Sequence, residues 1–276
     1  MDNQTHIGLK LFIKTSREVF TCDKPAVRNV YISEIVQNGA EYTLESYLAD
    51  KIPFFYRDLF KLVNSLSSGY FLSAIKETLE KLPTSESFIE SHFGEIVSSV
   101  FAEEVMGLTR IYSKLSLLTA QNANAYKMDL VLYDPKTDPI EFVFASVKSS
   151  PKNAAECYPA NHDKSCYADV FESFNKYSAD DLSFDLGAAK DRLETLPTEE
   201  RERLKEALKP YSSRTIIFSA FAVIDTSTKL DNEISVLATR KNKKEFGADL
   251  VCIENLSTVA SNAYKTLENV RKACSQ

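Results

Sequence analysis

The sequence predicts an α/β protein in which helices flank a mixed β-sheet. Three strand-like segments follow one another at residues 109–118, 125–134 and 140–148, and consecutive strands favour an antiparallel meander. Helical sequence then precedes an apolar strand-like segment at residues 214–225, which allows a parallel crossover. A sheet that combines both kinds of connection needs helices to cover its faces.

The chain begins with an expected N-terminal β/α extension. Residues 6–14 and 26–36 have the apolar alternation of strands, and residues 43–82 have helical spacing. A proline then interrupts the helical pattern, and candidate capping residues follow it. We therefore divide the chain into an N-terminal region, residues 1–84, and a second domain, residues 85–276.

The clearest helix is predicted at residues 85–107. Its apolar side chains recur every three or four residues, and Gly107 supplies a C-terminal stop. The opposite side carries Glu95 among short or polar side chains. These neighbours are Ser91, His92, Ser98 and Ser99. This polar side is either a solvated surface or the surroundings of a functional carboxylate.

Charged residues in the two strands that follow suggest chemistry. Asp129 lies between apolar neighbours in a predicted buried strand, where an unpaired carboxylate would be destabilising. Ser146 and Lys148 lie on one face of the next strand, because side chains alternate along a strand. Two interpretations remain open: a structural ion pair between Asp129 and Lys148, or half of a metal-dependent nuclease site.

Four motifs occur in a suggestive order from residue 85 onward. They are GEI at residues 94–96, YSKLSL at residues 112–117, the aspartate of MDLVLY and the Lys-Ser of the third strand. A helix with Glu, then a strand, a strand with Asp and a strand with Lys resembles the PD-(D/E)xK nuclease superfamily. More narrowly, the sequence is similar to the HamA family, the nuclease subunits of Hachiman antiphage defence systems. The resemblance implies a restriction-endonuclease-like core.

The resemblance also implies roles for individual residues. Glu95 would be the helix carboxylate, Asp129 the central metal ligand and Lys148 the catalytic lysine. Mg²⁺, or Mn²⁺, would be held by Asp129, Glu95 and the backbone carbonyl of Val147. The implied reaction is metal-dependent hydrolysis of DNA phosphodiester bonds, in which Lys148 orients water or stabilises charge on the phosphoryl oxygens.

Ser146 departs from the pattern of the superfamily, which has a carboxylate two residues before the lysine. A hydroxyl is a neutral ligand, whereas Mg²⁺ prefers anionic oxygen. The site is therefore expected to hold the cation less tightly. Three explanations remain open: a natural variant that still cleaves, a natural binder that has lost cleavage, or a sequence altered to disable it.

Partners follow partly from charge and partly from the resemblance. The net charge of −6 argues against binding DNA by bulk electrostatics, so DNA contacts would use a local patch. The sequence has no GxxxxGK[ST] loop, so ATP hydrolysis would need another subunit. The resemblance implies a HamB-like helicase that restrains the nuclease. The alternatives are a non-catalytic DNA-binding or regulatory subunit and, less favoured, a plain interaction domain.

Other features indicate a cytoplasmic protein without a membrane segment. The apolar runs are too short to span a bilayer, and the N-terminus lacks a signal-peptide pattern. The five scattered cysteines favour reduced thiols.

Two further segments carry metal-ligating or basic residues. A zinc cluster of Cys157, His162 and Cys166 matches no usual spacing, so we favour a loop at residues 151–183 that lies beside the site or contacts a partner. The basic run at residues 240–246 is either a phosphate contact or a solvated turn.

Overall fold

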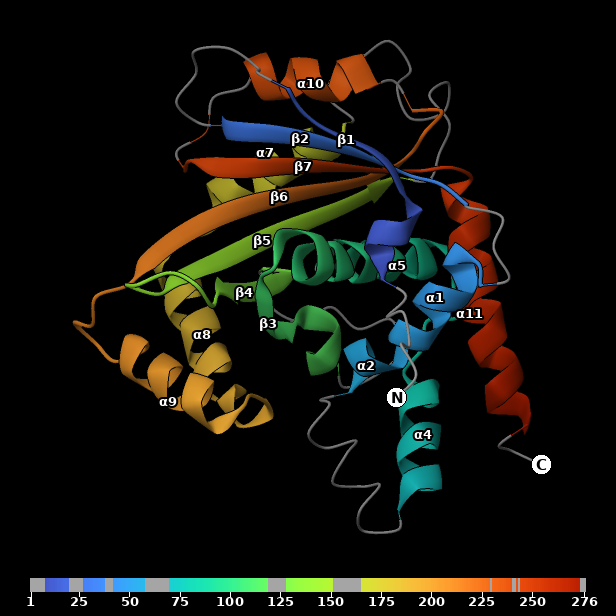
Figure 1. The fold of residues 1–276 in the computed structure, drawn as a ribbon, viewed down its shortest axis with the longest axis horizontal. Coiled ribbons are helices and arrows are strands. Elements are labelled where there is room, and N and C mark those ends of the chain that lie inside the picture. Colours follow the sequence, from blue (N-terminus) through green and yellow to red (C-terminus); the bar gives the residue numbers. More distant parts are fainter. Residues whose placement is uncertain are drawn as a thin grey trace, which may run out of the picture.

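A single seven-stranded sheet runs through the protein, in the order β1-β2-β7-β6-β5-β4-β3 (Figure 1). The computed structural model describes residues 8–19, 27–37, 42–57, 70–118, 128–150, 165–228, 230–239, 242 and 244–273. The strands are β1 (Ile13–Val19), β2 (Val27–Ile35), β3 (Thr109–Ser113), β4 (Leu130–Asp134), β5 (Glu141–Ser150), β6 (Thr215–Asp225) and β7 (Phe246–Ile253). The helices are α1 (Leu44–Lys51), α2 (Pro53–Tyr56), α4 (Phe71–Glu80), α5 (Glu86–Phe101), α7 (Cys166–Lys176), α8 (Ala179–Lys190), α9 (Thr198–Ala207), α10 (Leu230–Thr239) and α11 (Leu256–Ala273).

The sheet has the mixed topology that the sequence predicts. Strands β3, β4 and β5 form an antiparallel meander, and β5, β6 and β7 are parallel to one another. Helices fill the connections between the parallel strands, as parallel crossovers require. The α/β class with flanking helices is therefore confirmed, while the narrower PD-(D/E)xK core stays a prediction.

The N-terminal segment adds two strands to the same sheet. Strand β2 pairs in parallel with β7, and β1 forms the edge by pairing antiparallel with β2. The strand predicted at residues 6–14 is wrong at its start, because Leu9–Phe12 form a 3₁₀ turn before β1. Leu9 and Phe12, three residues apart, are both buried, and a turn directs both into the core. The domain division after residue 84 stays a prediction.

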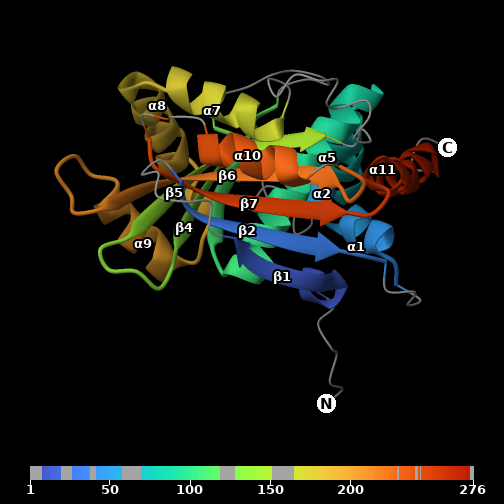
Figure 2. The ribbon, with the colours of Figure 1, turned by 90° about the horizontal axis from the view of Figure 1, so that it is seen from above.

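Each face of the sheet is covered by its own apolar cluster. On one face, Val143, Ala145 and Val147 of β5 pack with side chains of α5 and α11. On the other, Phe142 and Phe144 pack with side chains of α7 and α10. Figure 1 shows α5 in front of the sheet and α7 behind it, and Figure 2 shows α10 beside α7. This alternation places Ser146 and Lys148 on one face, as predicted, and that face is the one covered by α7.

Helix α5 lies where the sequence predicts a helix. Its polar side is largely buried, so the interpretation of that side as a solvated surface is wrong. The helix continues through a π turn, Ala102–Met106, and ends at Gly107, whose φ of +78° suits a glycine stop. Only Ser91 of the polar side is exposed. The buried members are His92, Glu95, Ser98 and Ser99. The polar side is buried because α5 packs closely on β5 and α11.

Three further elements differ from the sequence predictions. The strand predicted over residues 109–118 stops at Ser113, whose side chain accepts a hydrogen bond from Leu115 N and so begins the 3₁₀ turn Lys114–Leu117. The irregular stretch predicted after β5 contains α7, capped by the Ser165 side chain. Helix α10 was not predicted. Residues 151–164 lie outside the described residues.

No helix in the described part of the chain combines the length and the apolar character needed to cross a bilayer.

The buried carboxyl group of Asp249 in β7 gives a prediction about pH and stability. Burial raises its pKa to about 7, whereas an unfolded aspartate titrates near 3.9. The folded protein therefore keeps this proton where the unfolded chain has lost it, and stability should fall as pH rises from about 4 to 7. Thermal unfolding of Asp249→Asn should show a variant more stable than the parent by a few degrees at pH 8. The advantage should vanish near pH 4; an equal difference at both pH values would contradict the prediction.

Candidate active site

Two strand ends bring Lys114 and Asp129 together. Lys114 directly follows β3, and Asp129 directly precedes β4, its antiparallel neighbour. Lys114 N donates to Asp129 O at 2.9 Å, and Asp129 N donates to Ala145 O of β5 at 3.0 Å. Asp129 therefore lies just outside the strand in which it was predicted. These backbone bonds fix both residues at one end of the sheet.

The Asp129 carboxylate is buried, and each of its two oxygens accepts a hydrogen bond. Its Oδ1 accepts a hydrogen bond from Lys114 Nζ at 2.7 Å, and its Oδ2 accepts one from Val147 N at 2.7 Å. Lys114 Nζ also lies 3.5 Å from Glu95 Oε1. Glu95 belongs to α5, so the ammonium group of Lys114 connects the helix carboxyl to the strand carboxylate.

Asp129 forms its ion pair with a lysine other than the one expected from the sequence. The interpretation of Asp129 and Lys148 as a structural ion pair is wrong, because the partner of Asp129 is Lys114. Lys148 is partly exposed and makes no ion pair with another described residue. It is still close enough to lower the pKa of both Asp129 and Glu95. The structure thus gathers Glu95, Asp129 and Lys148 in one region and adds Lys114.

The two carboxyl groups differ in their protonation. Burial raises the pKa of Glu95 to about 8, although Lys114 opposes this effect. Burial would also raise the pKa of Asp129, but the positive charges of Lys114 and Lys148 and the Val147 N–H bring it below its ordinary value. At neutral pH Asp129 is therefore charged and Glu95 largely holds its proton.

Val147 and Ser146 complete this end of the sheet. Asp129 hydrogen-bonds the backbone on both sides of Ser146, at Ala145 O and Val147 N, so buried Ser146 lies beside the carboxylate. The N–H and C=O of one strand residue point to the same neighbouring strand. The Val147 carbonyl therefore points toward the side on which Asp129 lies.

The donors at this site can be compared with the needs of a hard cation. Glu95 Oε2 is buried and has no hydrogen-bond partner among the described residues. The described ranges contain no group of three or more His, Cys, Asp or Glu side chains arranged for a metal. Mg²⁺, however, keeps several waters and commonly uses only one or two carboxylates. The oxygens of Glu95, Asp129 and the Val147 carbonyl are of the kind that such a cation prefers.

A buried hydrogen-bond chain fixes α5 behind Glu95. The hydroxyl of Tyr56 lies 2.7 Å from His92 Nδ1 and 2.7 Å from the hydroxyl of Tyr264. Burial, with a contribution from Lys114, lowers the pKa of His92 to about 4, so its imidazole is neutral. Three elements, α2, α5 and α11, are thereby joined one helical turn from Glu95.

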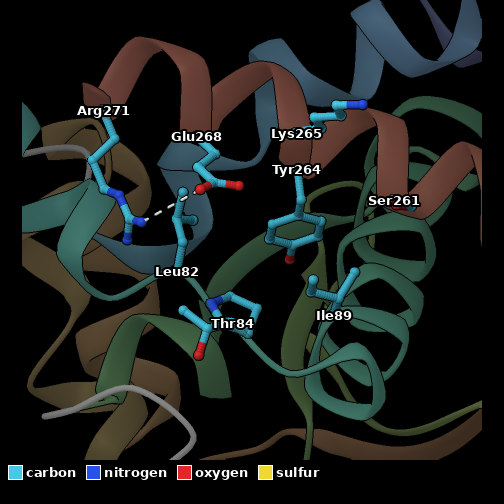
Figure 3. Close-up of a pocket in the computed structure, with 9 residues that line it drawn as sticks. Leu82, Thr84, Ile89, Ser261, Tyr264, Lys265, Glu268 and Arg271 are labelled. Atoms are coloured by element: carbon cyan, nitrogen blue, oxygen red, sulfur yellow. Dashed lines mark ion pairs between the residues drawn. The ribbon is translucent and has the colours of Figure 1, made fainter. Parts of the chain in front are cut away.

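Tyr264 also lines a pocket of about 310 Å³ between α11 and the start of α5 (Figure 3). Figure 3 shows its ring pointing from α11 toward Ile89 of α5. On the same helix, Arg271 Nη2 lies 3.8 Å from Glu268 Oε1. None of the predicted catalytic residues lines this pocket.

The other candidates from the sequence have structural explanations where they are described. Cys166 is buried, and its backbone N donates to Glu233 Oε1 at 2.9 Å. The remaining members of the considered zinc cluster lie outside the described residues. In the basic run, Lys244 Nζ donates to Phe174 O at 2.9 Å and to Tyr177 O at 2.6 Å. This lysine therefore binds carbonyls at the end of α7, where a cation is favourable.

Lys114 is the site residue to which the sequence assigned no role. It lies within the YSKLSL motif, but nothing in that motif alone indicates contact with two carboxyl groups. The available signal was its place in the middle of the predicted strand at residues 109–118, which is expected to pair with the predicted strand that contains Asp129.

Comparison with known proteins identifies a family. The family model described as HamA matches residues 9–267. No curated protein matches the chain.

Proposed function

This chain belongs to the HamA family, and from that membership, which implies a subunit of a Hachiman antiphage defence system, we propose that it is a metal-dependent DNA endonuclease. As the family implies, its activity would be regulated by a HamB-like helicase, and ATP hydrolysis would belong to that partner because this sequence has no GxxxxGK[ST] loop. The proposed place of action is the cytoplasm, where DNA of an infecting phage is exposed to both subunits.

The observation that carries the proposal is the convergence of two buried carboxyl groups and two lysines at one end of the sheet. Glu95 and Asp129 are both buried, and Lys114 Nζ lies 3.5 Å and 2.7 Å from their oxygens. Buried ionisable groups that perturb one another's pKa values are typical of catalytic sites.

In the proposed reaction, Glu95, Asp129 and the Val147 carbonyl would hold the cation. When bound, Mg²⁺ or Mn²⁺ would polarise the scissile phosphate and lower the pKa of the attacking water. The partly exposed Lys148 would orient that water or stabilise negative charge on the phosphoryl oxygens. The backbone bond from Val147 N would keep Asp129 oriented throughout.

Ser146 favours a second candidate function. A PD-(D/E)xK site would have a carboxylate at this position, and a hydroxyl provides no anionic ligand. The chain could instead serve as a non-catalytic DNA-binding or regulatory subunit on the same fold. Cleavage by the purified protein distinguishes the two functions.

The test is cleavage of supercoiled and linear DNA in Mg²⁺ or Mn²⁺, with and without the helicase. Ser146→Glu is expected to raise cleavage at least about tenfold, because it adds an anionic ligand beside Asp129. Ser146→Gln is the matched control. The glutamine side chain is nearly as large as that of glutamate but carries no charge, so this variant should cleave no more DNA than the parent. Asp129→Ala should abolish cleavage in either background.

Absence of cleavage in the parent chain and in Ser146→Glu, with both cations and with the helicase present, would overturn the nuclease proposal. Retained cation-dependent DNA binding would then support the non-catalytic subunit.

A further inference from the structure

Lys114 lies where a cation shared by the two carboxyl groups would lie. Its ammonium is 2.7 Å from Asp129 Oδ1 and 3.5 Å from Glu95 Oε1. We propose that Lys114 is a built-in competitor for the divalent cation, so that the site loads only when the Lys114 side chain moves away. This inference rests on the proposed metal-dependent function and adds a means of regulating it.

The two cations exclude one another for geometric and electrostatic reasons. Mg²⁺ binds oxygen at about 2.1 Å. A divalent ion on Asp129 Oδ1 would therefore lie within about 5 Å of an ammonium that donates to the same oxygen at 2.7 Å. Charges of the same sign at that separation in a buried site repel strongly. The second oxygen of Asp129 already accepts a hydrogen bond from Val147 N, and a divalent ion bound to its remaining lone pair would still be repelled by the nearby ammonium.

Lys114 can leave without disturbing the sheet. Its side chain is 18% exposed, and a lysine has a flexible four-carbon stem. The backbone bond from Lys114 N to Asp129 O holds the main chain in place. Rotation of the side chain toward solvent would thus free two carboxyl groups that are already positioned. Any partner or DNA phosphate that attracts the displaced ammonium would favour loading.

The first test measures Mn²⁺ binding to the full chain by electron paramagnetic resonance and calorimetry. Lys114→Met keeps the length of the stem but removes the competing charge, and it should bind Mn²⁺ at least about tenfold more tightly than the parent. Lys148→Met is the matched control. It removes the same charge near the same carboxyl groups but breaks no ion pair with a described residue, and its gain should be clearly smaller. Lys114→Arg retains the charge and should resemble the parent.

Equal gains in Lys114→Met and Lys148→Met would overturn the inference, since they would reflect net charge alone. Weaker Mn²⁺ binding in Lys114→Met would also overturn it, because Lys114 would then be needed to position the ligands.

The second test needs no substitution and so does not depend on the folding of a variant. Lysines are acetylated briefly in the parent protein, and the modification of each is quantified by mass spectrometry with and without Mg²⁺. Saturating Mg²⁺ should raise the labelling of Lys114 several-fold by releasing its ammonium. Unchanged or lower labelling of Lys114 would contradict displacement.

These outcomes separate the inference from the proposed function. If Lys114→Met binds Mn²⁺ more tightly and no form of the protein cuts DNA, the competitor role stands and the nuclease proposal fails. If DNA is cleaved and Lys114 labelling does not respond to Mg²⁺, the nuclease proposal stands and the competitor role fails.

Discussion

Asp129→Ala is expected to lower the free energy of unfolding by about 3 kcal/mol or more, in addition to abolishing cleavage. The substitution leaves Lys114 in a mostly buried position with the carboxyl group of Glu95, at 3.5 Å, as its remaining described partner. It also removes the acceptor for Val147 N. Breaking a buried ion pair by removing one partner typically costs about 3–5 kcal/mol. Thermal unfolding should show a fall of about 6–12 °C in melting temperature for a chain of this size.

The same experiment includes a control and a rescue. Asp134→Ala, at the other end of β4, removes a carboxylate that is partly exposed and caps a turn at Lys136 N, and it should cost less than about 1 kcal/mol. Adding Lys114→Met to Asp129→Ala should recover part of the lost stability, because it removes the unpaired buried charge. Additive losses in the double variant would show that the pair is not coupled.

The sequence predicted the fold well where the local pattern and the tertiary packing agree. The meander β3–β5 and the apolar strand β6 have the length and alternation of strands, and the structure has them at those places. The prediction failed at Leu9–Phe12, where an alternating pattern forms a turn because both ends are buried. It also missed α10, although the apolar residues Leu230, Ile234 and Leu237 recur there at helical spacing.

Of the candidate site, the sequence singled out Glu95, Asp129 and Lys148, but it indicated neither Lys114 nor the contacts among these residues. The helix and strand pattern puts Glu95 on a helix and Asp129 and Lys148 on two consecutive strands. The structure places these three residues near one another. The pairing of Asp129 with Lys114 depends on the register of β3 against β4, which a sequence pattern does not fix. The burial of Glu95 likewise depends on how closely α5 approaches β5.

The close approach of α5 to β5 predicts a large loss of stability when Gly94 is replaced by alanine. A Cβ atom added at Gly94 would lie 2.5 Å from Ser149 Cβ, which belongs to the rigid part of a β5 residue. Gly94→Ala should therefore push α5 away from the sheet, at an overpacking cost of about 1–3 kcal/mol or more. The loss should exceed the roughly 1 kcal/mol that alanine gains over glycine within a helix. Because Glu95 is the next residue, its 3.5 Å contact with Lys114 should also lengthen, and cleavage should fall together with stability.

Gly187→Ala provides the matched control, since Gly187 lies within α8 and a Cβ there meets nothing within 4 Å. This variant should be stabilised by up to about 1 kcal/mol in denaturant unfolding, whereas Gly94→Ala is destabilised. Ser149→Gly removes the opposing Cβ, so the double variant Gly94→Ala/Ser149→Gly should be more stable than the sum of its single substitutions predicts. If Gly94→Ala behaved like Gly187→Ala, the helix and strand would not be in close contact. The burial that perturbs Glu95 would then need another cause.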